Sequence, residues 1–213
     1  MKVTKEKTRY IHEPSTYEIF QSLSGMPAYS KILIEQNPDQ PYSDFLRWLI
    51  SKNFYNERTE KIAIKKIASD FNTETTKVTK WLKKIYEQIF ELNFNKPELF
   101  QKNGIKVDMY ISHYDSSCSF YLSLPILPRE FETFRFPFVK GKVGTDYFWV
   151  KKVEHEIVED IASVTLWLVA GFVNKYREFA LDKALFQDRI PLMDVYHKHD
   201  FELDDELKKI FRS

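Results

Sequence analysis

Residues 64–84, with the sequence IKKIASDFNTETTKVTKWLKK, constrain the fold of this chain more than any other segment. Apolar side chains recur at helical spacing on both sides of the polar stretch NTET. This spacing predicts a short helix that ends near residue 71 and a longer helix that begins at residue 75, with a tight turn between them. The core at the crossing of the two helices would consist of Ile67, Phe71, Val78 and Trp81.

Two further residues suit a close crossing of these helices. Ala68 is small enough for the second helix to pass over it. Asn72 falls where the turn needs a left-handed backbone, which asparagine adopts more readily than other residues with a Cβ atom. The pattern resembles the helix-turn-helix superfamily of DNA-binding proteins, in which the second helix lies in the major groove. The resemblance covers about a tenth of the chain.

Positive charge is concentrated in the same part of the sequence. Residues 58–84 contain eight Lys and Arg against three Asp and Glu, a net charge of +5, whereas the whole chain carries +1. The rest of the chain therefore has a net charge of −4. A basic segment in an otherwise acidic chain favours contact with phosphate, and a solvated helix face rich in lysine is the alternative interpretation.

The resemblance implies a set of DNA-contacting residues at the start and on the exposed face of the second helix. Thr75, Thr76 and Thr79 would contact base edges, and the lysines would contact phosphates or guanine. Lys65, at the start of the preceding helix, would anchor a phosphate. The predicted nucleic-acid-binding residues are Lys65, Glu74, Thr75, Thr76, Lys77, Thr79, Lys80, Lys83 and Lys84.

Three helices are expected before this segment, at residues 14–23, 27–36 and 43–53. In the third, Phe45, Trp48 and Leu49 fall on one face, so this helix would complete a three-helix DNA-binding unit. The helix that begins at Thr75 should reach about Leu92, because its apolar stripe continues that far.

After residue 97 the apolar period changes from that of a helix to that of a strand. Two alternating segments, 105–112 and 118–124, are joined by HYDSS and read as a hairpin. A second pair is expected at 134–139 and 145–155, joined by the glycine-bearing KGKVG. The four segments predict a four-stranded antiparallel sheet with one face covered.

The cover would come from a long helix over residues 156–181, where Ile157, Ile161, Val164 and Leu168 recur at helical spacing. The predicted fold is therefore α+β. Residues 1–100 would form a helical domain with the helix-turn-helix, and residues 101–213 an α+β domain of antiparallel sheet, long helix and C-terminal helices. The boundary lies near residues 93–104, where NFNKPELFQKNG interrupts the helical pattern.

Candidate catalytic groups are few. His113, Asp115 and Cys118 are clustered but fall at a predicted hairpin turn, where such residues serve the backbone conformation. His197 and His199 with Asp200 could offer metal ligands, but no clear third ligand follows. There is no phosphate-binding glycine loop and no zinc-finger spacing. We therefore expect a protein that is not an enzyme and that holds no metal or cofactor.

Composition predicts a cytoplasmic protein. The single Cys118 excludes an internal disulfide, and residues 1–9 lack the apolar segment of a signal peptide. The most apolar run, residues 161–173, is too short to span a bilayer, and we expect it to form a buried helix. The abundance of Phe, Tyr, Ile, Lys and Asn suggests an AT-rich bacterial, plasmid or phage gene.

The expected function is sequence-dependent binding of double-stranded DNA, as a transcriptional regulator or an accessory or replication factor of a bacterial mobile element or phage. Residues 101–213 would then serve for homodimerisation, effector sensing or contact with a protein partner. The alternative is a protein–protein interaction module, such as a phage- or defence-related inhibitor or an immunity-type protein, with the helix-turn-helix as scaffold only. The near-neutral charge and the acidic tail at residues 200–206 favour this alternative.

Overall fold

The N-terminal half of the chain is helical, as expected. The computed structural model describes residues 10–52, 63–159 and 161–211. The first five helices are α1 (Thr16–Gly25), α2 (Pro27–Gln36), α3 (Ser43–Ser51), α4 (Ile64–Asp70) and α5 (Thr75–Asn95). Residue 53, where α3 was expected to end, lies outside the described residues.

Local signals in the sequence explain where the first two helices begin. Ser15 accepts a hydrogen bond from the Glu18 N–H on its side chain, and the Glu18 carboxylate accepts one from the Ser15 N–H. This capping box starts α1 at residue 16, two residues later than expected. Pro27 occupies the first position of α2, where its missing N–H costs no hydrogen bond.

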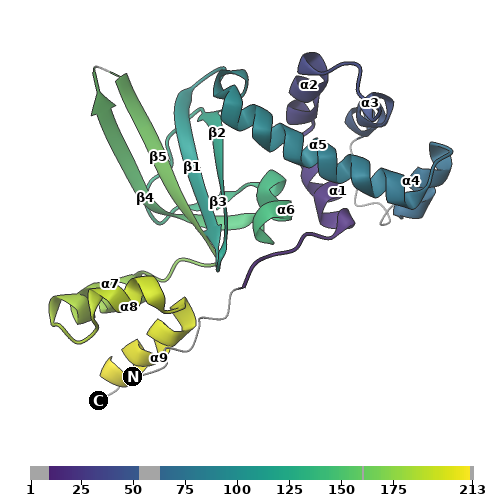
Figure 1. The fold of residues 1–213 in the computed structure, drawn as a ribbon. Coiled ribbons are helices and arrows are strands. Elements are labelled where there is room, and N and C mark those ends of the chain that lie inside the picture. The colour runs from purple at the N-terminus through teal and green to yellow at the C-terminus, as the bar shows by residue number, and fades with distance from the viewer. Residues whose placement is uncertain (1–9, 53–62, 160, 212–213) are drawn as a thin grey trace, which may run out of the picture.

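The sheet contains five strands, and the prediction of four antiparallel strands was wrong. The strands are β1 (Ile105–His113), β2 (Ser116–Leu124), β3 (Thr133–Arg135), β4 (Tyr147–Val158) and β5 (Ile161–Ala170), in the order β2-β1-β5-β4-β3 (Figure 1). The expected hairpin β1–β2 is confirmed, with Tyr114 at φ 51° in its turn. β1 and β5 run parallel, with Met109 opposite Leu166, and the other pairs are antiparallel.

The prediction of a long helix over residues 156–181 was also wrong. The segment is the end of β4, the whole of β5 and the start of α7 (Lys175–Phe186). Leu166 and Leu168 point into the core, while Trp167 lies on the other face against Tyr110 of β1, with ring centroids 4.9 Å apart. Because β5 is a central strand with apolar side chains on both faces, its period of two is hidden, and its apolar residues also match helical spacing.

The expected second strand pair is present in part, because β3 and β4 pair antiparallel with Phe134 opposite Phe148, but the segment between them is helical. A 3₁₀ turn, η2 (Pro137–Val139), leads into the short helix α6 (Lys140–Val143), which ends at Gly144 with φ 82°. Pro137 has no N–H for a sheet ladder, so the strand predicted for 134–139 stops at residue 135. Gly141 lies against the side chain of Tyr86, where an added Cβ would be only 3.0 Å from two ring carbons and from the hydroxyl oxygen.

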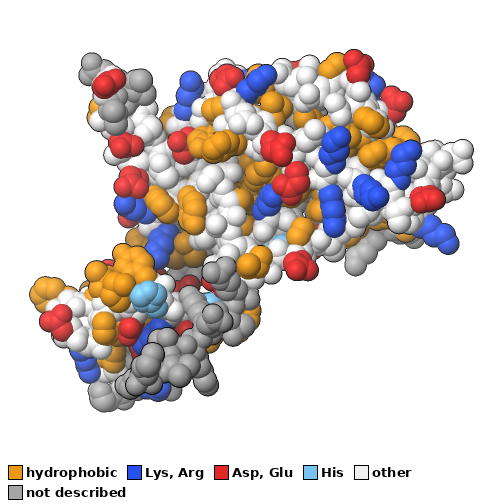
Figure 2. All heavy atoms as spheres, viewed as in Figure 1, with side chains coloured by type: hydrophobic (Ala, Val, Ile, Leu, Met, Phe, Trp, Pro, Cys, Tyr) orange, Lys and Arg blue, Asp and Glu red, His pale blue; other side chains and the backbone are white. Residues whose placement is uncertain are grey.

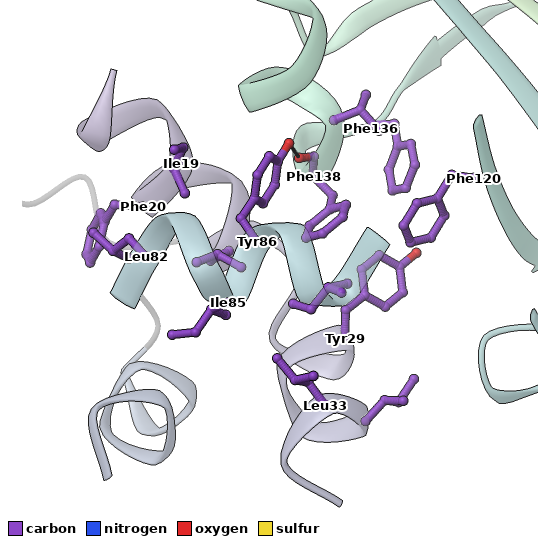
Figure 3. Packing of buried hydrophobic residues seen from close by; sticks show 14 of the residues in the cluster. Ile19, Phe20, Tyr29, Leu33, Leu82, Ile85, Tyr86, Phe120, Phe136 and Phe138 are labelled. Carbon is purple, nitrogen blue, oxygen red and sulfur yellow. Dashed lines mark hydrogen bonds between the residues drawn. The ribbon is translucent and has the colours of Figure 1, made fainter. Parts of the chain in front are cut away.

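One hydrophobic cluster joins the helical layer to the inner face of the sheet. Tyr86 of α5 donates a hydrogen bond of 2.6 Å to the carbonyl of Phe138, and Phe138 packs against Phe120 of β2 at 5.3 Å (Figure 3). α5 and α6 therefore provide the cover that the long helix was predicted to supply, and α1 packs against both of them. Side chains from both halves of the chain contribute to this cluster. The division at residues 1–100 and 101–213 stays a prediction.

The C-terminal residues form a separate helical group at the lower end of the strands in Figure 1. The group consists of α7, α8 (Leu192–His197) and α9 (Asp200–Phe211). The Arg177 guanidinium of α7 pairs with Asp200 and Asp204 of α9. The group has a small core of its own, made of Ala180, Leu181, Ala184, Ile190, Leu203 and Leu207. Among all the described helices, none has both the length and the apolar character needed to cross a membrane.

Candidate nucleic-acid interface

The turn between α4 and α5 is closed around a left-handed asparagine. The N–H of Asn72 donates to the Ser69 carbonyl over 3.0 Å. The N–H of Thr73 donates to the Ala68 carbonyl over 2.9 Å. Asn72 has φ 45°, which confirms the prediction for this residue. The two bonds form a Schellman motif, which satisfies carbonyls at the end of α4 and fixes the direction in which the chain leaves the helix.

Four aromatic side chains hold α3, α4 and α5 together. Phe45 stacks on Trp81 with ring centroids 5.8 Å apart, and it meets Phe71 edge to face at 5.6 Å. Trp48 packs against Phe71 at 5.3 Å. The aliphatic residues of the predicted crossing are fully buried, whereas Phe71 and Trp81 keep part of their surface exposed. The expected three-helix packing is therefore present, with a half-buried aromatic cluster at its centre.

The predicted nucleic-acid-binding residues lie on the outer sides of two adjoining helices. All are exposed except Thr79, which is half-buried. Figure 2 shows Lys and Arg side chains gathered over the part of the molecule where α4 and α5 lie, at the right of the view. The exposed residues are Lys65, Glu74, Thr75, Thr76, Lys77, Lys80, Lys83 and Lys84. Their contact with nucleic acid stays a prediction.

Two of these lysines lie over aromatic rings. The Lys77 Nζ is 5.1 Å from the centroid of the Trp81 ring, and the Lys84 Nζ is 5.8 Å from that of Tyr42. No carboxylate among the described residues forms an ion pair with any lysine of residues 63–84. The positive charge of these lysines is therefore not neutralised by described residues. The rings of Trp81 and Tyr42 limit the conformations of Lys77 and Lys84 before any ligand binds.

Glu74 and Thr76 interact with each other at the start of α5. The Thr76 hydroxyl donates a hydrogen bond of 2.9 Å to the Glu74 carboxylate. A carboxylate suits the N-terminus of a helix, but it repels phosphate at close range. Contact between Thr76 and a base edge would break this bond. We therefore expect the lysines to supply most of the affinity.

Lys66 is a candidate that the sequence reasoning left out of the site. It is exposed on α4 beside Lys65, while Ile67 and Ala68 on the same helix are buried. Of the lysines on α4, the resemblance pointed only to Lys65 as a phosphate contact. The signal that could have found Lys66 is the helical spacing itself, because the two buried residues leave both lysines facing solvent.

The three groups of the suggested nucleophilic cluster, Cys118, His113 and Asp115, each have a different environment in the structure. Burial raises the pKa of the Cys118 thiol to about 12, so the thiol is neutral near pH 7. The Nδ1 atom of His113 lies 2.7 Å from the carbonyl oxygen of Val143. The Asp115 carboxylate accepts a hydrogen bond of 2.7 Å from the N–H of Tyr10. The expectation that the chain is not an enzyme stays a prediction.

Residues of both histidine-containing clusters meet at one cavity. It has a volume of about 430 Å³ and lies where β1 and β5 end and α9 begins. His113, Asp115, His199 and Asp200 contribute to its lining. The described residues contain no group of three or more His, Cys, Asp or Glu arranged to hold a metal ion. His197 is exposed on α8 and is not among the lining residues.

Comparison of the chain with family models, with curated proteins and with solved structures finds no match in any of the three. Function is therefore argued from the residues and their geometry.

Proposed function

We propose that the protein binds double-stranded DNA through the outer side of α4 and the N-terminal half of α5. One observation carries the proposal: six exposed lysines on the two helices have no ion-pair partner among the described residues. They are Lys65, Lys66, Lys77, Lys80, Lys83 and Lys84. Neutralisation of DNA phosphates by these lysines would release the counterions condensed on the DNA, and this release would supply the binding free energy.

The position of α5 supports this proposal. Ile85, Tyr86 and Ile89 in its C-terminal half are buried in the main core, so the N-terminal half is held rigidly. The major groove is about 12 Å wide and admits such a helix. Thr75 and Lys77 at its start would face base edges, while Lys65 and Lys66 of α4 would contact the flanking phosphates. The role would be that of a transcriptional regulator or an accessory or replication factor of a bacterial mobile element or phage.

A protein-interaction module is the second candidate function. Large apolar side chains are exposed on α7 and α8, and a surface of this kind marks an interaction site in a soluble protein. In this case α4 and α5 would be scaffold, and their lysines would be solvated. The two candidates differ in their dependence on salt, because only DNA binding requires the release of counterions from phosphate.

Titration of the full chain with a random-sequence duplex at several salt concentrations tests the proposal. The logarithm of the association constant should fall linearly with the logarithm of salt concentration, by about 0.9 for each phosphate neutralised. Six lysines allow a slope of up to roughly −5. No measurable binding at low salt, or affinity independent of salt, would contradict the proposal and leave the interaction module as the better candidate.

A further inference from the structure

Helices α7 and α8 expose an unusual amount of apolar side chain. Phe186 is 88% exposed, Tyr176 72% and Phe179 66%, all on α7. On α8, Leu192, Met193 and Tyr196 are each more than half exposed. Figure 2 shows hydrophobic side chains gathered at the lower left of the view, where α7 and α8 lie in Figure 1. Soluble monomers rarely leave a contiguous apolar surface of this size open to water.

The exposed side chains of α7 form a stripe on one side of the helix. Tyr176, Phe179 and Phe186 follow each other at intervals of three and seven residues, which places them on one face. Ala180, Leu181 and Ala184 are buried on the opposite side, in the core that α7 shares with α9. α7 is therefore apolar on two sides, and only one of them is covered by described residues. A helix of this kind needs a second apolar partner.

The C-terminal helices cannot obtain much stability from their own core. Among the described residues its buried members are six, two of them alanines, and four further apolar side chains are only partly buried against them. These residues form a cluster separate from that of the sheet and the N-terminal helices. A core of this size supplies little free energy against the entropy of ordering three helices. Burial of the α7 stripe in an interface would add the missing apolar contact.

We propose that a second copy of the protein covers this surface, with α7 and α8 of the two copies packed across a two-fold axis. The exposed side chains of Phe172, Tyr176, Phe179, Phe186, Leu192, Met193 and Tyr196 offer roughly 700–900 Å² of apolar area, and a stable interface needs about 800 Å² per partner. Beside the stripe lie exposed Lys175, Asp182 and Lys183. Charges of both signs suit pairing with an identical surface better than with a strongly acidic or basic partner.

The choice of a second copy also rests on the proposed function. Helix-turn-helix units commonly bind DNA as two-fold pairs, because two recognition helices then read successive turns of the major groove. The α7–α8 surface lies at the lower left of Figure 1 and α4 with the start of α5 at the right, so dimerisation would leave the lysines of both copies free. The inference narrows the expected dimerisation region, residues 101–213, to two helices.

Sedimentation of the full chain over a range of micromolar concentrations tests the dimer. The mass should be twice that of one chain, and it should fall towards one chain on dilution. Replacement of both Phe179 and Phe186 with Glu should give a folded monomer at every concentration. Phe94→Glu is the matched control, because Phe94 is 70% exposed on α5, away from the stripe. This variant should sediment as the wild type does.

Three results would each overturn the proposed interface. The wild type could be a monomer at tens of micromolar, it could form an open-ended series of larger species, or the double variant could stay dimeric. If the double variant loses its helical circular dichroism signal, Phe186→Ser alone replaces it, since this side chain is almost fully exposed. Binding of the same proteins to a random-sequence duplex separates this inference from the proposed function. A monomer that binds DNA overturns only the dimer, whereas a dimer that fails to bind overturns only the DNA proposal.

Discussion

Asn72 determines the direction in which the chain leaves α4. Its positive φ permits the two backbone hydrogen bonds that close the turn. This residue could be identified from the sequence, because the requirement for a left-handed backbone is local and few side chains meet it. The lysines are different. The number of lysines and the helix face that they occupy could be predicted from the sequence. The positions of the Trp81 and Tyr42 rings beneath Lys77 and Lys84 could not, because they depend on how the helices pack.

Substitution of Asn72 tests the left-handed turn. Asn72→Ala should lower the free energy of unfolding by about 1 kcal/mol, because Ala at positive φ brings its Cβ close to a carbonyl oxygen. Asn72→Gly should be neutral or slightly stabilising, because Gly adopts this conformation without strain. Chemical denaturation of both variants measures the difference. Equal stability of the two variants would show that the turn does not depend on this conformation.

Helix α5 belongs to both the proposed DNA surface and the main core. The lysines of α5 lie in its N-terminal half. Near its C-terminal end, Asn93 forms hydrogen bonds with the edge strand β2. The Asn93 amide donates to the Tyr121 carbonyl over 2.7 Å, and its oxygen accepts the Tyr121 N–H over 2.9 Å. Asn93 thus takes the place of a neighbouring strand, which protects the sheet edge.

Removal of the Asn93 amide should be costly for this reason. Asn93→Ala leaves a backbone donor and an acceptor of β2 without their partner, which should lower the free energy of unfolding by roughly 2–4 kcal/mol. Asn95→Ala, two residues further and exposed, is the matched control and should stay within about 0.5 kcal/mol of wild type. Urea denaturation measures both. A change at Asn93 as small as that at Asn95 would contradict the assigned role.

Elements defined by local signals were predictable, and those defined by distant neighbours were not. The five N-terminal helices and the β1–β2 hairpin follow from caps, prolines and clear periods. β5 was assigned to a helix because Trp167 and Val169 are apolar on its outer face. Apolar residues lie on both faces of β5 because it is a central strand that pairs with both β1 and β4. The turn before β5 has Glu159 at φ 49°, and the sequence has no glycine there to indicate a turn.

At the scale of the whole molecule, two surfaces have different chemistry. Lysines cover α4 and the first half of α5, while apolar side chains lie open on α7 and α8. Between them, the sheet and its helical cover share one hydrophobic core. The charge concentration was predictable from the count of lysines. The apolar surface was not, because its residues were assigned in part to a buried long helix.

The central claim is that the lysines of α5 bind DNA, and one comparison of variants tests it most directly. Lys77, Lys80 and Lys83 are all replaced with Glu, and the affinity for a random-sequence duplex is measured by fluorescence anisotropy at moderate salt. The control replaces three exposed lysines elsewhere, Lys31, Lys102 and Lys209, with Glu, so that the net charge changes equally. Both variants should keep the wild-type circular dichroism spectrum, since all six side chains are exposed.

The account predicts that the α5 variant loses measurable binding, while the control stays within a few-fold of wild type, because only the first set lies where phosphate is expected. Equal affinity of the α5 variant and the control would contradict the account and show that α4 and α5 are not the DNA-binding surface.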